Sequence, residues 1–289
     1  MGAPAVRYLV FDVEGVADME LVSRQRYGGQ ALDERAALER FRREMVDRYD
    51  NDFVPYTYQI PAAVGVAKVA ADFRLIDLAV LDEPNYRPHL MTEQFWRGWT
   101  KYKHPTLVSF HGRAFDLPVL ELAAFRYGLS LPAWFQGTGK GNSRGRFNAD
   151  SHFDVEEFLT NFGATRITGG LNLAANLLGK PGRMMGHDDR VQDMWLAGQR
   201  DEISQLCRWD VLDTYFVFLR SRVLVGQLSL DEEHACVQHT RAWLEERAEQ
   251  QTAYQMYLDA WGDWDNPWAT ETNGDEKAPP PKSKGSKGK

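Results

Sequence analysis

The sequence predicts an α/β protein in which a mixed β-sheet carries helices on both faces. Three observations support this prediction: a strand-like run near the start (8–14), two runs that suit a hairpin (62–70 and 74–81), and helical periodicity through most of the remainder. Strands interleaved with helices are typical of a sheet covered on both sides. At 289 residues and 43% hydrophobic, the chain is long enough for one sizeable core and an appendage.

The first strand ends in two carboxylates. Its apolar, β-branched and aromatic residues favour a strand, in which successive side chains point to opposite faces. Asp12 and Glu14 therefore share one face, and Leu9, Phe11 and Val13 share the other. Two neighbouring carboxylates repel and are costly to bury, and a hard divalent cation would neutralise them. The alternative is an ordinary charged strand end that enters a loop.

Helix signals and one more strand account for most of the later chain. Pro118 suits a first helical turn and Gly128 a helix end, and Ser229 with Glu232 forms a capping box before the final helix. The predicted strand is 106–110, and the predicted helices are 31–49, 91–103, 115–128, 153–162, 170–178, 190–197, 201–225 and 229–261. Residues 277–289 are rich in Lys and Pro and are expected to be disordered.

Composition limits the compartment and the partners. The formal charge of −7 gives no general basic field, although local patches could still bind nucleic acid. Cys207 and Cys236 fall in predicted helices, form neither a metal motif nor a disulfide framework, and suit a reducing compartment. The N-terminus has no signal-like run, and no stretch is long and apolar enough for a membrane span. We expect a soluble, cytoplasmic protein without membrane contact.

A basic, glycine-rich stretch at 137–146 invites comparison with a phosphate loop, but its spacing does not match. A mobile basic loop over a nucleic-acid groove and a plain flexible loop both fit. Four basic residues could guide a single-stranded nucleic acid towards the acids through contacts with its phosphates. They are Lys140, Arg144 and Arg146 in this stretch and Arg113, which follows the β-strand at 106–110. Solvated loop charges explain them equally well.

Two further acids fall where they could join the first pair. Asp116 follows the strand at 106–110 at the start of a helix, and Asp210 lies on the long helix expected to pack across the sheet. Asp213, one turn further along that helix, is the alternative to Asp210.

Three motifs resemble those of the DEDD 3′–5′ exonucleases. Residues 11–14 (FDVE) resemble the first motif. Residues 109–118 (SFHGRAFDLP) resemble the second, in the form found in bacterial stand-alone exonucleases similar to the proofreading domain of family B DNA polymerases. Residues 207–215 (CRWDVLDTY), followed by 218–220, resemble the third. The resemblance extends over about residues 6–225 and keeps the motifs in order.

The resemblance implies a ribonuclease H-like fold, with Asp12, Glu14, Asp116 and Asp210 as catalytic residues that hold two divalent ions, Mg²⁺ or Mn²⁺. Two such ions can activate a water, orient the scissile phosphate and stabilise the leaving 3′ oxygen. The implied activity is 3′–5′ exonuclease action on a single-stranded 3′ end. The expected substrate is DNA in preference to RNA. Proofreading, repair trimming and RNA turnover all fit. The expected substrate contacts are His111, Arg113, Phe115, Lys140, Arg144 and Arg146.

The expected domains are the exonuclease domain at 1–226, a C-terminal helical extension at 227–262 that could bind a protein partner, and the tail at 263–289.

Two positions depart from the family pattern. His111 stands where the second motif usually begins with Asn. Leu206 stands four residues before Asp210, where related members carry a tyrosine that positions the attacking water, and Gln205 replaces the His of the other subgroup. Three explanations remain open: slower catalysis by the metals alone, substitution by a group such as His187, or a binding or scaffold module without catalysis.

Overall fold

The computed structural model describes residues 4–136, 143–183 and 189–268. Its centre is a five-stranded sheet in the order β3-β2-β1-β4-β5, which confirms the predicted mixed α/β architecture. Strand β1 pairs antiparallel with β2 and parallel with β4. The strands are β1 (Val6–Ala17), β2 (Gln59–Ala70), β3 (Leu75–Val80), β4 (Thr106–Ser109) and β5 (His152–Asp154).

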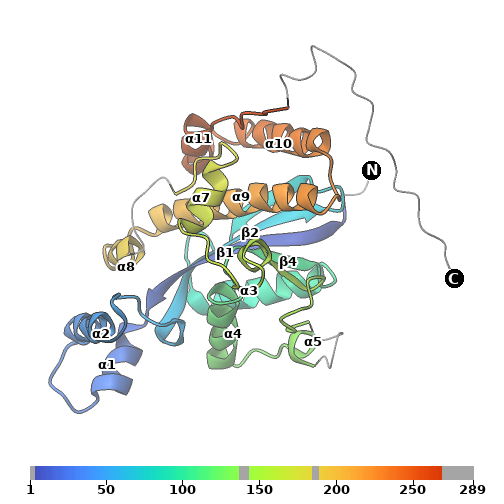
Figure 1. Ribbon diagram of the computed structural model, residues 1–289. Helices are drawn as coiled ribbons and strands as arrows, with labels where there is room; N and C mark the ends of the chain where they lie inside the picture. The colour runs from blue at the N-terminus through green and yellow to red at the C-terminus, as the bar shows by residue number, and fades with distance from the viewer. Residues whose placement is uncertain (1–3, 137–142, 184–188, 269–289) are drawn as a thin grey trace, which may run out of the picture.

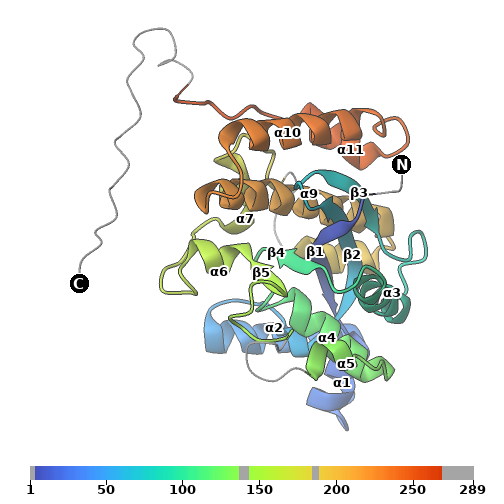
Figure 2. The ribbon, with the colours of Figure 1, turned by 90° about the vertical axis from the view of Figure 1, so that its right-hand side faces the viewer.

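Helices cover both faces of the sheet (Figures 1 and 2). Helix α9 (Arg200–Leu224) crosses one face, whereas α3 (Pro88–Lys101) and α4 (Asp116–Tyr127) lie on the other. Residues on both sides of β1 are therefore buried, among them Val10 and Phe11. Because β1 is central and covered on both faces, the polar side chains in its second half are held close to the core.

The C-terminal helices form a further layer over the outer side of α9 (Figure 1). The prediction of one helix over 229–261 was wrong: the chain forms α10 (Leu230–Glu245) and α11 (Thr252–Asp259), separated by a turn. The predicted capping box at Ser229 and Glu232 is confirmed. The Trp209 indole on α9 donates to the carbonyl of Ala253 at 2.8 Å. The two helices therefore belong to the core that α9 forms with the sheet.

A helical arm projects from the sheet between β1 and β2 (Figure 1). It comprises α1 (Met19–Tyr27) and α2 (Glu34–Tyr49), of which the sequence predicted only the second. The arm has its own apolar cluster, which includes Val22, Phe41 and Met45. This separate cluster makes the arm a packed unit rather than a loop.

One predicted helix, at 153–162, was wrong in part. Its first residues belong to the edge strand β5, and only Val155–Leu159 form a helix, α6. Asp154 caps α6 by accepting from the N–H groups of Glu156 and Glu157. The remaining helices are a 3₁₀ turn (Tyr56–Tyr58), α5 (Pro132–Phe135), α7 (Gly170–Asn176) and α8 (Asp189–Leu196).

The low-complexity segment at 277–289 lies outside the described residues. Within the described part of the chain, no helix is long and apolar enough to cross a membrane.

Candidate active site

Three carboxylates meet at the second half of β1, past the part of the strand that pairs with β4. The predicted end of this strand at its two acids was wrong, because β1 continues to pair with β2 as far as Ala17. Asp12 and Glu14 on β1 and Asp210 on α9 each offer an oxygen, and these oxygens lie within 4.8 Å of one another. The alternation of β1 places the first two on one face, and α9 packs across that face. Hard divalent cations prefer oxygen ligands in such an arrangement, so this donor set fits Mg²⁺ or Mn²⁺.

A close approach of α9 to the sheet brings Asp210 to Asp12. Asp12 pairs in register with Gly65 on β2. A Cβ added to Gly65 would lie 2.8 Å from Cγ2 of Val211 and 3.0 Å from Sγ of Cys207. Because glycine leaves this space open, the helix can lie directly on the strand beside the acids.

Asp116 lies beside the three carboxylates but also has a backbone partner. Its Oδ1 accepts from the N–H of Val13 at 2.9 Å. The parallel pairing of β1 with β4 ends at Val10, so β1 continues past β4 and its next N–H groups on that side need another acceptor. Asp116, in the first turn of α4, supplies it. This bond fixes the start of α4 against the acidic part of β1.

Burial and mutual repulsion disfavour the charged forms of these acids. The pKa of Asp12 is raised well above its ordinary value, mainly by burial and then by Asp116 and Asp210, while Arg183 opposes the shift. The pKa of Asp116 is also raised, mainly by burial, with Asp154 and Glu14 adding to the effect and the Val13 N–H opposing it. A divalent cation would favour the ionised forms by offsetting the repulsion.

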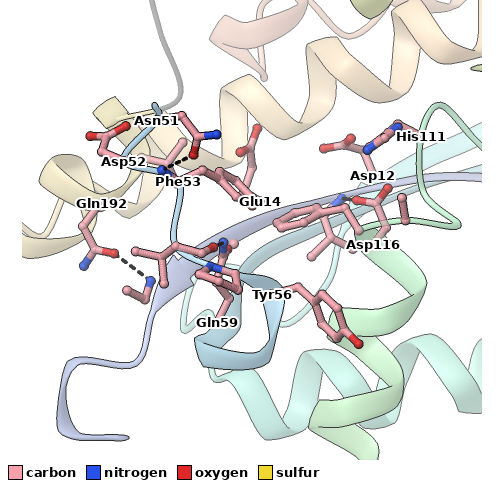
Figure 3. A pocket seen from close by; sticks show the side chains of 18 of the residues that line it. Asp12, Glu14, Asn51, Asp52, Phe53, Tyr56, Gln59, His111, Asp116 and Gln192 are labelled. Carbon is pink, nitrogen blue, oxygen red and sulfur yellow. Dashed lines mark hydrogen bonds between the residues drawn. The ribbon is translucent and has the colours of Figure 1, made fainter. Parts of the chain in front are cut away.

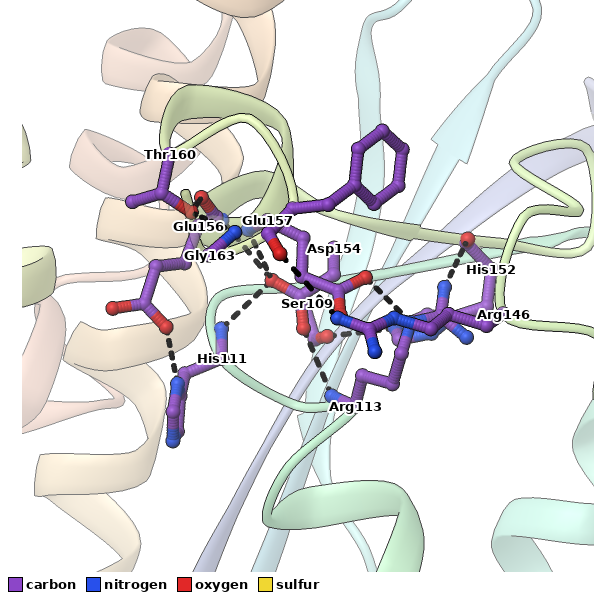
Figure 4. A network of polar contacts seen from close by, with 11 residues as sticks. Ser109, His111, Arg113, Arg146, His152, Asp154, Glu156, Glu157, Thr160 and Gly163 are labelled. Atoms are coloured by element: carbon purple, nitrogen blue, oxygen red, sulfur yellow. Dashed lines mark hydrogen bonds and ion pairs between the residues drawn. The ribbon is translucent and has the colours of Figure 1, made fainter. Parts of the chain in front are cut away.

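A polar network holds the turn between β4 and α4 (Figure 4). Asp154 accepts from the backbone N–H groups of His111 at 3.1 Å and Arg113 at 2.9 Å. His111 has a φ of 64°, in the left-handed region that Asn and His tolerate better than most residues. Its Nδ1 contacts Glu156 on α6. The network therefore ties the second motif to β5 and α6, and a histidine is sterically acceptable where the family usually has Asn.

The predicted substrate contacts fall into two groups. His111 and Phe115 line the cavity that contains the acids. The three arginines engage carboxylates elsewhere: Arg113 with Glu157 at 2.7 Å, Arg146 with Glu157 at 3.2 Å and Arg144 with Glu121 at 2.8 Å. Lys140 lies outside the described residues.

Leu206 is 8% exposed and belongs to the main apolar core. Its side chain has no hydroxyl with which to position a water. His187, the predicted substitute, lies outside the described residues.

Arg183 is a site residue that the sequence did not identify. Its Nη2 lies 3.7 Å from Oδ2 of Asp210, and its backbone N–H donates to Oδ1 of Asn172 on α7 at 2.9 Å. No motif in the sequence pointed to it, because the contact with Asp210 depends on the packing of α7 against α9. A cation therefore lines the acidic cavity.

Asp213, the alternative to Asp210, has a different partner. Its Oδ1 accepts from the hydroxyl of Tyr257 on α11 at 2.6 Å. Burial raises the pKa of Asp213 to about 8. The acid cluster contains Asp210, whereas Asp213 links α9 to the C-terminal layer.

The acids lie in a cavity of about 640 Å³ (Figure 3). Asn51, Asp52 and Phe53 border one part of it, and Tyr56 and Gln59 border another. Arg42 and Tyr49 of the arm also line it. The cavity thus combines carboxylates, cations and aromatic rings.

Comparison with known families matches residues 51–261 to a family described as "Predicted 3'-5' exonuclease related to the exonuclease domain of PolB". The chain belongs to this family. The match contains Asp116 and Asp210 but begins after Asp12, Glu14 and the arm. A comparison with curated proteins gave no match.

A solved structure of the family B DNA polymerase from the hyperthermophilic archaeon Pyrobaculum calidifontis is similar to the chain, with 14% identity and a TM-score of 0.48. This similarity covers 86% of the chain and 30% of the polymerase.

Proposed function

We propose that the protein is a metal-dependent 3′–5′ exonuclease that hydrolyses single-stranded nucleic acid, DNA in preference to RNA. The observation that supports this most directly is the meeting of Asp12, Glu14 and Asp210 within 4.8 Å in an exonuclease-family chain. The family's relation to a DNA polymerase domain favours DNA.

Four acids would hold two divalent ions: Asp12, Glu14 and Asp210 from the cluster, and Asp116 beside it. When bound, such ions supply activation of water and stabilisation of the leaving 3′ oxygen. The protein itself would hold the carboxylates at fixed positions although they repel one another. Strand β1, the first turn of α4 and the close approach of α9 to Gly65 provide these positions.

Other residues would bind and orient the strand. Arg183, beside Asp210, is placed to contact a phosphate in the cavity, and His111 and Phe115 to contact the terminal nucleotide. Arg113, Arg144, Arg146 and Lys140 remain proposed contacts for the strand outside the cavity.

A labelled-strand assay tests the proposal. Incubate the protein with a 5′-labelled single strand and Mg²⁺ or Mn²⁺, and compare wild type, Asp12→Ala and Asp72→Ala. We expect a ladder shortened from the 3′ end for wild type and for Asp72→Ala, whose exposed carboxylate lies in the β2–β3 turn. Asp12→Ala is expected to lose it. Absence of metal-dependent shortening in wild type would contradict an exonuclease function.

Leu206 favours a second candidate, a nucleic-acid-binding or scaffold module with weak or no catalysis. Its buried side chain replaces the expected tyrosine, and general acid–base assistance is worth about 10²–10⁴-fold in rate. Leu206→Tyr separates the two functions. A large gain in cleavage indicates an assembled metal site that lacks only the water-positioning group. Strand binding without cleavage in both proteins supports the binding module.

The remaining parts of the proposal concern location and assembly. Both cysteines are free and buried, which supports a reducing, cytoplasmic compartment. The division at 226/227 and a protein partner on the C-terminal helices stay predictions.

A further inference from the structure

We propose that the arm and the segment after it form a wall, made of Arg42, Tyr49 and Phe53, that binds the nucleic-acid single strand as it enters the acidic cavity. This inference rests on the exonuclease function proposed above and extends it to residues on the arm side of the site. The expected ligand chemistry is a nucleic-acid single strand, with Arg42 facing a phosphate and the two rings facing bases.

The wall lines the same cavity as the acids. Arg42 and Tyr49 on α2, and Phe53 in the segment after it, border the cavity that also contains Asp12 and Glu14. The family match begins at residue 51, so Arg42 and Tyr49 precede the matched region. Residues that precede the matched region thus contribute to the lining of the cavity.

The arm is anchored well enough to act as a wall. Within it, Arg26 pairs with Glu44 at 2.9 Å. Its base is held where Tyr58 donates to Gln25 at 2.6 Å. Together with the arm's apolar cluster, which includes Ala17 at the end of β1, these contacts hold α2 against α1.

The aromatic part of the wall is open to a ligand. Tyr49 is 60% exposed and Phe53 is 51% exposed. The backbone N–H of Phe53 donates to Oδ1 of Asn51 at 3.1 Å, which orders the segment that carries the ring. Exposed rings that border a cavity can stack on bases, and such stacking tolerates any sequence because every base has a π-face.

Phe53 also faces the second motif across the site. Its ring centroid lies 5.8 Å from that of Phe115, the residue before Asp116. Gly15 on β1 makes room for this arrangement, because a Cβ there would lie 2.9 Å from Cζ of Phe115. A base that stacks on Phe53 would therefore be held beside the start of α4 and close to the acids.

Arg42 supplies positive charge at the cavity, where the carboxylates alone would repel a nucleic-acid strand. Four carboxylates repel a polyanion, so a strand needs cations at the cavity to approach them. Arg42 lines the cavity, and its side chain is only partly buried. A phosphate oxygen would provide an acceptor for this guanidinium.

Equilibrium binding tests the wall separately from catalysis. In an Asp12→Ala background, measure by fluorescence anisotropy the affinity for a labelled single strand of about 12 nucleotides, a length within the usual range of single-strand sites. Compare Arg42→Ala with Arg43→Ala, an exposed neighbour outside the cavity lining. Compare Phe53→Ala with Phe125→Ala, which is 84% exposed on α4 and also outside the lining.

We expect Phe53→Ala to weaken binding about 5-fold or more, the low end of the loss for one stacked base. We expect Arg42→Ala to weaken it about 3- to 10-fold and to reduce the slope of log affinity against log salt by about 0.7, the value for one phosphate contact on a single strand. Arg42→Lys should restore the slope. Thermal unfolding of each variant shows whether the fold is intact.

The outcomes distinguish this inference from the proposed function. If wild type degrades the strand but Arg42→Ala or Phe53→Ala binds within about twofold of its control, the wall is wrong and the exonuclease function stands. If wild type neither degrades nor binds a single strand, both are wrong. In the active background, weakened binding should raise KM and leave kcat nearly unchanged, because the wall contacts the strand away from the reacting phosphate.

Discussion

Replacing Gly65 on β2 with alanine should push α9, which carries Asp210, away from the sheet that carries Asp12 and Glu14. The new Cβ would lie 2.8 Å from Cγ2 of Val211, whereas carbon atoms in contact prefer about 3.5–4.0 Å. Helix α9 or the Val211 side chain must then move by about 0.7–1.2 Å to restore that contact distance. Overpacking of this kind costs about 1–3 kcal/mol of unfolding free energy. A shift of about 1 Å at Asp210 would also lower the exonuclease rate about 10²-fold.

The control is Gly98→Ala, in the interior of α3, where a Cβ would meet nothing within 4 Å. That change should stabilise the protein by about 0.5–1 kcal/mol, because alanine favours the helix. Urea unfolding and the labelled-strand assay measure both effects. Adding Val211→Ala to Gly65→Ala should recover part of the loss, since the two side chains compete for one space. If Gly65→Ala is as stable and active as Gly98→Ala, the close approach of α9 does not position Asp210.

Three further predictions concern pH, the C-terminal layer and metal. Burial lowers the pKa of His152 well below its ordinary value, so below about pH 6.5 the unfolded chain binds a proton that the native protein does not. As the pH is lowered, the free energy of unfolding should therefore decrease more steeply in wild type than in His152→Gln, by up to about 1.4 kcal/mol per pH unit. Urea unfolding between pH 7 and pH 5 measures both slopes. Equal slopes would contradict this. Tyr257→Phe removes the hydroxyl that donates to the buried carboxyl of Asp213 and should cost about 1–3 kcal/mol in urea unfolding at pH 7, a prediction that an unchanged midpoint would refute. Mn²⁺ at 100 times its dissociation constant should stabilise wild type by about 2.7 kcal/mol in thermal unfolding, while EDTA stops degradation. Asp12→Asn should lose most of this stabilisation, and an equal gain in that variant would place the ion elsewhere.

The central part of the fold was predictable because its signals are local. Strand β1 has apolar residues on both faces around its two acids, and the long apolar run of α9 identifies the helix that crosses the sheet. The order of the three motifs predicts Asp116 and Asp210 near that strand.

The errors arose where tertiary contacts decide the structure. The edge strand β5 has three residues, too few to show an alternating pattern, and it pairs with β4 about 45 residues earlier in the chain. The pairing of Arg113 with Glu157 depends on that strand. Arg183 reaches Asp210 because Asn172 holds its backbone, and no spacing rule in the sequence encodes that contact.

The distribution of the acids along the chain has a consequence for synthesis. The backbone of Asp12 contacts Cys207, one turn before Asp210, across 195 residues. At ordinary rates of translation, the ribosome needs about 10–40 s to make that length. Helix α11, which contacts Asp213 through Tyr257, is synthesised later still. A nascent chain therefore carries Asp12 and Glu14 without their partner until Asp210 has been made, and the proposed nuclease activity can begin only after that point.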